Sequence, residues 1–166
     1  METKMTSSGR AVVTLPTDTQ ILITRDFNAP KHLVYKAWTT PELIKRWWSG
    51  DRGAVVSIEV DLRVGGRWRY VMTANEGFEV AFHGEYRDIV PNERIVSTEA
   101  FEGIPDPDAA AALTTNTFTE KDGRTTVTIL VQHKNQEHRD MHINSGMEVG
   151  LQEAMDHLEQ VALSLR

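Results

Sequence analysis

The sequence contains no cysteine among its 166 residues. This absence excludes disulfide bonds, thiolate metal sites, iron–sulfur clusters and a cysteine nucleophile. Long hydrophobic runs are also absent, because every apolar stretch is far shorter than the roughly 20 residues that a membrane-spanning helix needs. The start of the chain is polar and does not resemble a signal peptide. We therefore expect a cytoplasmic protein that does not insert into a membrane.

Cationic side chains are fewer than anionic ones. Lys and Arg total 18 against 24 Asp and Glu, which gives a formal net charge of −6. Because nucleic-acid affinity comes largely from Lys and Arg that neutralise phosphates, we expect no nucleic acid among the partners. The pair Gly65-Gly66 precedes a predicted strand and not a helix, so it matches no phosphate-binding loop. We expect no cofactor.

The length of the chain fits a single domain. Residues 1–10 are polar and are expected to form a flexible tail, which leaves 11–166 as one ligand-binding domain. One feature of the composition is uneven, because all four tryptophans lie between positions 38 and 68. The tryptophans are therefore concentrated in the first half of the domain.

The pattern of strand and helix signals has a definite order. Alternating β-branched and aromatic residues predict strands, and the segments Asn28-Ala29-Pro30 and Thr40-Pro41-Glu42 are typical starts of short helices. The predicted order is a strand at 21–27, two short helices at 31–38 and 41–48, strands at 54–60, 67–72, 78–90, 94–101, 113–120 and 124–133, and a long helix at 147–165. Strands that follow one another without intervening helices indicate the α+β class.

The long amphipathic helix is too narrow to cover such a sheet. A helix is about 10–12 Å across, whereas six or seven strands span about 30 Å. With the two short helices closing one end, we expect a cavity between the sheet and the last helix. A partly apolar cavity with a few polar groups is the default candidate for a binding site.

Several motifs in the right order resemble one family, and they extend over roughly residues 11–165. They are Ile23 to Pro30, Val34 to Glu42, Trp47-Trp48, Asp61 to Trp68, Gly84 to Val96, and Asp122 to Thr125. These segments resemble the corresponding segments of the family of proteins like the activator of heat-shock protein 90 ATPase. Where that family often has Gly-Trp early in the last helix, this chain has Gly150-Leu151. The cavity is therefore expected to be roomier at that point.

The resemblance implies the helix-grip fold of the START and birch-pollen-allergen superfamily (SRPBCC, Bet v 1-like). In this fold a curved antiparallel sheet of six to seven strands wraps around a long C-terminal helix, with two short helices after the first strand. The resemblance also implies ligand binding in a hydrophobic cavity. Polyketide cyclases and aromatases occur elsewhere in the superfamily.

The residues expected to line the cavity are aromatic or apolar and lie near its predicted walls. They are Trp47, Trp48, Trp68, Tyr70, Phe82, Met147, Leu151 and Met155. The alternative for Trp38 and Trp68 is packing in the core, since each ring can bury 150–250 Å². Adjacent residues on a helix point about 100° apart, so we expect one of Trp47 and Trp48 in the core and the other at the mouth of the cavity or on the surface.

Three histidines are candidates for a metal site. His138 and His142 would share one face of a helix, and His133 lies nearby in the sequence. A third ligand is not evident and the segment is polar throughout, so we expect no metal site. We expect this segment to form a solvated loop or the start of a helix instead.

A row of charged residues on the long strand offers candidate catalytic groups. Glu79, His83 and Glu85 alternate on one face, where a histidine–carboxylate pair could transfer protons. The opposite face carries the apolar set, including Phe78, Phe82 and Tyr86, so the charged row is expected to face solvent. Gly84 predicts a bend or bulge that could change this alternation.

Three functions are compatible with this sequence. The leading hypothesis is binding of a small hydrophobic or amphipathic ligand, either lipid-like or of the polyketide or aromatic type. The second is an enzyme of the cyclase or hydrolase type that would use His83 with Glu79 or Glu85 inside the cavity. The third is a chaperone ATPase-stimulating partner module, which we rank last. The sequence leaves a homodimer open.

Overall fold

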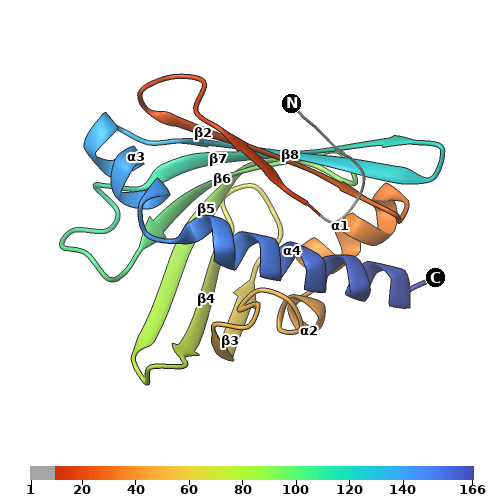
Figure 1. Cartoon of the computed structure of the whole chain (residues 1–166), viewed down its shortest axis with the longest axis horizontal. Coiled ribbons are helices and arrows are strands. Elements are labelled where there is room, and N and C mark those ends of the chain that lie inside the picture. The colour runs from red at the N-terminus through yellow and green to blue at the C-terminus, as the bar shows by residue number, and fades with distance from the viewer. Residues whose placement is uncertain (1–9) are drawn as a thin grey trace.

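The computed structural model describes residues 10–166, so the tail expected at 1–10 lies outside the described residues except for Arg10. The elements are β1 (Val12–Thr14), β2 (Gln20–Phe27), α1 (Lys31–Thr39), α2 (Pro41–Ile44), β3 (Gly53–Val60), β4 (Arg67–Ala74), β5 (Glu79–Val90), β6 (Arg94–Phe101), β7 (Ala112–Lys121), β8 (Arg124–Gln132), α3 (Gln136–Ile143) and α4 (Met147–Ser164). This order confirms the α+β class (Figure 1). Within the described range, no helix combines the length and the hydrophobicity needed to cross a bilayer.

The described strands form one curved antiparallel sheet of eight strands, in the order β1-β2-β8-β7-β6-β5-β4-β3. The sequence predicted six to seven strands, and that number is too low. The strand that was not predicted is β1, a three-residue edge strand that pairs with β2. Three residues are too few to show the alternation by which a strand is recognised in a sequence.

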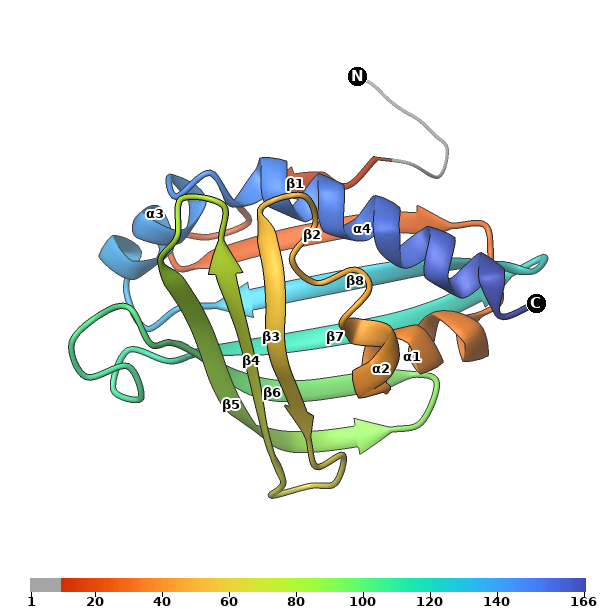
Figure 2. The ribbon, with the colours of Figure 1, turned by 90° about the horizontal axis from the view of Figure 1, so that it is seen from below.

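The long helix α4 lies across the concave face of this sheet (Figures 1 and 2). Figure 2 shows α1 and α2 toward the C-terminal end of α4, whereas α3 lies near its start. Along β2 and β8 every second residue is buried, as expected when one face of a sheet meets a core. On the helix side, Leu158 and Ala162 are fully buried against that face. The core therefore lies between the sheet and α4, as the helix-grip fold requires.

A buried ion pair fixes the second half of α4 on β2. Arg25 is only 2% exposed, and its guanidinium donates to Glu159 and to Asp156, each at 3.0 Å. The second carboxylate oxygen of Glu159 accepts a hydrogen bond from the backbone N–H of Asn28 at 2.8 Å. A charge buried this deeply is tolerated only when it is paired and hydrogen-bonded. These contacts therefore set the position of the helix over the sheet.

The second short helix is shorter than predicted. It was expected to reach Trp48, but α2 ends at Ile44 and the next residues form turns. In these turns the backbone N–H of Trp47 bonds back to the carbonyl of Ile44, three residues earlier. The Trp47 indole N–H also donates to the carbonyl of Ala37 at 2.9 Å, which draws the chain back against α1. This tertiary hydrogen bond overrides the helical spacing of the sequence.

The segment with His138 and His142 is helix α3, so the helical alternative holds there. Asn135 begins this helix, and its side-chain oxygen accepts a hydrogen bond from the backbone N–H of His138 at 2.8 Å.

The glycine at position 150 lies inside α4 with open space where a Cβ would be placed. No other element therefore requires a glycine at this position, and the helix simply tolerates it.

Candidate functional site

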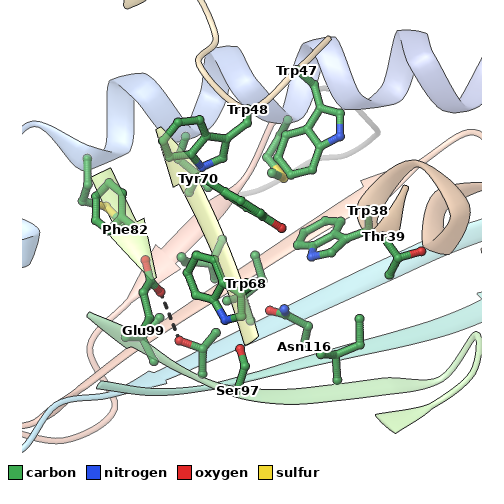
Figure 3. A pocket seen from close by; sticks show the side chains of 18 of the residues that line it. Trp38, Thr39, Trp47, Trp48, Trp68, Tyr70, Phe82, Ser97, Glu99 and Asn116 are labelled. Atoms are coloured by element: carbon green, nitrogen blue, oxygen red, sulfur yellow. Dashed lines mark hydrogen bonds between the residues drawn. The ribbon is translucent and has the colours of Figure 1, made fainter. Parts of the chain in front are cut away.

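A cavity of about 240 Å³ lies between the inner face of the sheet and α4 (Figure 3). The eight residues expected from the sequence all contribute to its lining: Trp47, Trp48, Trp68, Tyr70, Phe82, Met147, Leu151 and Met155. They come from the turns after α2, from β4 and β5, and from the first half of α4. The structure thus brings these residues together, and ligand binding by them stays a prediction.

Aromatic rings in mutual contact form one wall of the cavity. The ring of Trp48 lies 5.4 Å from Tyr70 and 6.0 Å from Phe82, both edge-on. The ring of Trp68 lies 4.8 Å from Tyr70 in a tilted arrangement. Edge-on and tilted pairs at these distances are favourable, so the rings hold one another in place. We call Trp48, Trp68, Tyr70 and Phe82 the aromatic wall.

The two adjacent tryptophans have different environments. Trp47 is 5% exposed, belongs to the core and contacts the ring of Trp38 at 5.6 Å. Trp48 is half-buried and packs against β4 and β5. Both also line the cavity, because they lie on turns and not on one helix. Trp47 is the core member that the sequence argument required, and Trp48 is the more accessible one.

Sequence reasoning missed a larger part of the lining. Trp38, for which packing in the core was the alternative, also lines the cavity. The lining residues that were missed are Ile23, Thr39, Tyr86, Ile95, Ser97, Glu99, Thr114, Asn116, Ile129, Val131 and His142. Four of these are polar residues on β6 and β7, with Ser97 paired opposite Thr114 across the two strands. The alternation of β6 contained the signal, because Ile95, Ser97 and Glu99 must share a face. We call Ser97, Glu99, Thr114 and Asn116 the polar floor.

Two polar atoms of the lining, one in the aromatic wall and one in the polar floor, have no hydrogen-bond partner among the described residues. They are the indole nitrogen of Trp68 and the side-chain oxygen of Asn116, and each residue is 8% exposed. By contrast, Glu99 accepts a hydrogen bond from the hydroxyl of Thr114 at 3.2 Å. Buried polar atoms are nearly always paired, so the two orphaned atoms mark a place where a partner is to be expected.

The tyrosines of the cavity stay neutral at ordinary pH. Burial raises the pKa of Tyr70 well above its usual value, and the nearby Tyr86 and Glu99 raise it further. Burial also raises the pKa of Tyr86. Both side chains therefore offer hydroxyl groups that donate or accept hydrogen bonds, and not phenolates.

The histidines at the end of β8 and in α3 form a pair next to the cavity. His142 lines the cavity, and its Nδ1 lies 2.9 Å from Nε2 of His133. Burial, together with the neighbouring His142, lowers the pKa of His133 to about 4. Among residues 10–166, no group of three or more His, Cys, Asp or Glu side chains has an arrangement that could hold a metal ion.

The candidate catalytic row lies on the other face of the sheet. None of Glu79, His83 and Glu85 lines the cavity, although Phe82 beside them does. His83 instead bonds through Nδ1 to Glu102 at 2.8 Å and through Nε2 to Asp108 at 2.5 Å. The hypothesis of a cyclase or hydrolase placed His83 with Glu79 or Glu85 inside the cavity. The positions of these side chains contradict that catalytic assignment.

The interactions around His83 are those of a surface ion cluster. The hydrogen bond to Asp108 is the main cause that raises the pKa of His83. Arg69 donates twice to Glu102 at 2.9 Å and is the main cause that lowers the pKa of this carboxyl to about 2. The cluster ties the loop after β6 to the outer face of β4 and β5.

The bend that was expected at Gly84 lies slightly further along β5. The register of β5 against β6 shifts between Tyr86 and Asp88. Gly84 has a different role, because a Cβ there would lie 1.9 Å from the carbonyl oxygen of Thr98 and 2.5 Å from the indole nitrogen of Trp68. The absence of a side chain thus lets both β6 and the Trp68 ring approach β5 closely.

Solved structures with the same architecture come from several bacteria. A protein of Rhodobacter sphaeroides aligns with a TM-score of 0.84 at 23% identity, covering 95% of this chain and 100% of its own. A protein of Mycobacterium smegmatis aligns with a TM-score of 0.81 at 24% identity, covering 91% of this chain and 96% of its own. At these identities the likeness shows the shared helix-grip fold. No curated protein matches the sequence.

The family comparison agrees with the motifs. The family model described as "Activator of Hsp90 ATPase homolog 1-like protein" matches residues 28–162, which is most of the chain. The match begins just after β2 and includes the cavity-lining turns, the sheet and nearly all of α4. The chain therefore belongs to the family of Activator of Hsp90 ATPase homolog 1-like proteins.

Proposed function

We propose that this protein binds a small hydrophobic or amphipathic ligand, lipid-like or aromatic, in the cavity between the sheet and α4. The lining carries the proposal, because it combines a wall of contacting aromatic rings with a few polar side chains on one side. Ligand sites in proteins have this composition, mostly apolar with a small number of placed polar groups. The volume of about 240 Å³ lies just below the usual range of about 300–1,000 Å³ for ligand pockets, so the ligand is small.

Position 151 offers a direct way to close the cavity. Leu151 lines it from α4, whereas Val149 lies two residues earlier on the same helix and is 53% exposed. Replacing Leu151 by Trp fills space inside the cavity, and replacing Val149 by Trp adds the same ring outside it. The two variants therefore separate occupation of the cavity from general hydrophobicity of the surface.

The test uses N-phenyl-1-naphthylamine, an uncharged dye that fluoresces in apolar surroundings. We expect the wild-type protein to bind it saturably, the Leu151→Trp variant to bind it at least about tenfold more weakly, and the Val149→Trp variant to match the wild type. Fluorescence titration gives the three dissociation constants. Absence of saturable binding, or equal binding by the Leu151→Trp variant, would contradict the proposal.

A further inference from the structure

We propose that the cavity selects an uncharged aromatic ligand with a hydroxyl group, held by Trp68 of the aromatic wall and Asn116 of the polar floor. The ligand oxygen would accept the indole N–H of Trp68, and the ligand hydroxyl would donate to the side-chain oxygen of Asn116. This inference rests on the proposed function, that the cavity binds a ligand, and adds the chemical class of that ligand.

The first argument is the state of the two orphaned atoms. The Trp68 indole nitrogen can only donate and the Asn116 side-chain oxygen can only accept. Both are buried, and both lack a partner among the described residues. An unmade hydrogen bond at a buried atom is costly, so a group that supplies both an acceptor and a donor gains affinity there. A hydroxyl group supplies both.

The second argument is where the fold places these atoms. Trp68 pairs opposite Gly84, and a Cβ on Gly84 would lie 2.5 Å from the indole nitrogen, so this nitrogen sits over β5. The next strand, β6, presents Ser97 opposite Tyr86, and β7 follows with Asn116 opposite Ile95. Figure 3 shows Trp68, Ser97 and Asn116 at the same side of the cavity, below the rings of Trp48 and Tyr70.

The third argument is charge. No Lys or Arg is among the described residues that line the cavity, and Glu99 is the only carboxylate there. A ligand carboxylate would lie near this carboxylate without a Lys or Arg to offset the repulsion and the loss of hydration. The lining therefore disfavours fatty acids and aromatic acids. It favours a ligand that is neutral at physiological pH.

The aromatic wall completes the description of the ligand. The rings of Trp48 and Trp68 each contact the ring of Tyr70, and the three rings lie above the polar floor in the view of Figure 3. A flat ring system can pack against such rings with edge-on or offset contacts. The ligand class is thus a small hydroxylated aromatic molecule, with its ring in the apolar part of the cavity and its hydroxyl on the floor.

Three probes of the same ring system test this inference by calorimetric titration. They are 2-naphthol, naphthalene and 2-naphthoate, which differ only in a hydroxyl, no substituent or a carboxylate. We expect the wild-type protein to bind 2-naphthol at least about tenfold more tightly than naphthalene, and 2-naphthoate more weakly than 2-naphthol. Equal affinities for 2-naphthol and naphthalene, or preference for 2-naphthoate, would overturn the inference.

Two variants assign the preference to the floor. Asn116→Leu has a similar volume without the acceptor, and Trp68→Phe keeps an aromatic ring without the N–H. We expect either variant that folds to reduce the preference for 2-naphthol over naphthalene to less than about threefold while naphthalene still binds. A preference that persists in both variants would contradict the assignment. If the wild type binds neither these probes nor N-phenyl-1-naphthylamine, the proposed function fails as well.

Discussion

Trp47 and Trp68 carry the same side chain but use it differently. The indole N–H of Trp47 donates to the carbonyl of Ala37, so this residue fixes the turns after α2. The indole N–H of Trp68 has no partner among the described residues and lies over β5 beside the cavity. The first N–H therefore stabilises the fold, whereas the second is the one that we propose a ligand accepts. Sequence alone cannot distinguish the two, because the difference depends on which backbone carbonyl lies within reach.

Two histidines are placed so that their effects on stability oppose each other. His83 is paired with Asp108 and Glu102, which raises its pKa, whereas burial lowers the pKa of His133 to about 4. In an unfolded chain both would titrate near 6.5. Folding therefore favours the proton on His83 and disfavours it on His133.

The pH dependence of stability follows from these directions. Between pH 6.5 and about 4 the unfolded chain binds the proton that folded His133 excludes, so this residue makes stability fall as the pH is lowered. The stabilisation from His83 is complete below pH 6.5 and is lost as the pH rises through its raised pKa. We expect these two contributions to give a stability maximum near pH 6.5, measured by urea unfolding with tryptophan fluorescence.

Single variants separate the two contributions. His133→Gln should flatten the acid side of the stability profile, by at most about 1.4 kcal/mol per pH unit for one proton. His83→Gln should flatten the side just above pH 6.5 and leave the slope between pH 5 and 6 unchanged. If His133→Gln retains the full slope between pH 5 and 6, the assignment of that slope to His133 is wrong.

At the scale of the elements, the site depends on how closely neighbouring strands approach. Gly84 lets the backbone of β6 and the Trp68 ring lie against β5, as the short distances from a hypothetical Cβ show. The inner faces of β6 and β7 then present the polar floor to the cavity. By contrast, Gly150 in α4 has open space where a Cβ would be placed, so a methyl group fits at this position.

Two glycine-to-alanine variants test this contrast. Gly84→Ala should destabilise the protein by about 2 kcal/mol or more, because the added methyl meets the backbone of Thr98 and the Trp68 ring. Gly150→Ala should stabilise it by about 0.5–1 kcal/mol, because alanine favours a helix interior and nothing opposes its methyl. Free energies of unfolding from urea titrations give both values. A Gly84→Ala variant as stable as the wild type would refute the close packing of β5 and β6.

For the whole molecule, hydrophobic patterns that extend over many residues predicted the structure better than patterns that extend over only a few. The helical spacing of residues 147–165 and the alternation in the long strands predicted α4, most of the sheet and the cavity with eight of its lining residues. The three-residue strand β1 and the early end of α2 depend on tertiary pairing, which leaves no periodic signal. The polar floor was missed because Ser97, Glu99 and Asn116 resemble ordinary solvent-facing strand residues until the inward face of β6 and β7 is known.

The central proposal is that the cavity under α4 binds a small hydrophobic or amphipathic ligand. The most direct measurement is a ¹H–¹⁵N NMR titration with N-phenyl-1-naphthylamine, because each tryptophan indole N–H gives its own signal. The account predicts saturable shifts of the Trp48 and Trp68 indole signals, while the backbone amides of residues 103–111, which do not line the cavity, stay in place. Indole signals that do not move at saturation, or shifts that are largest in residues 103–111, would contradict it.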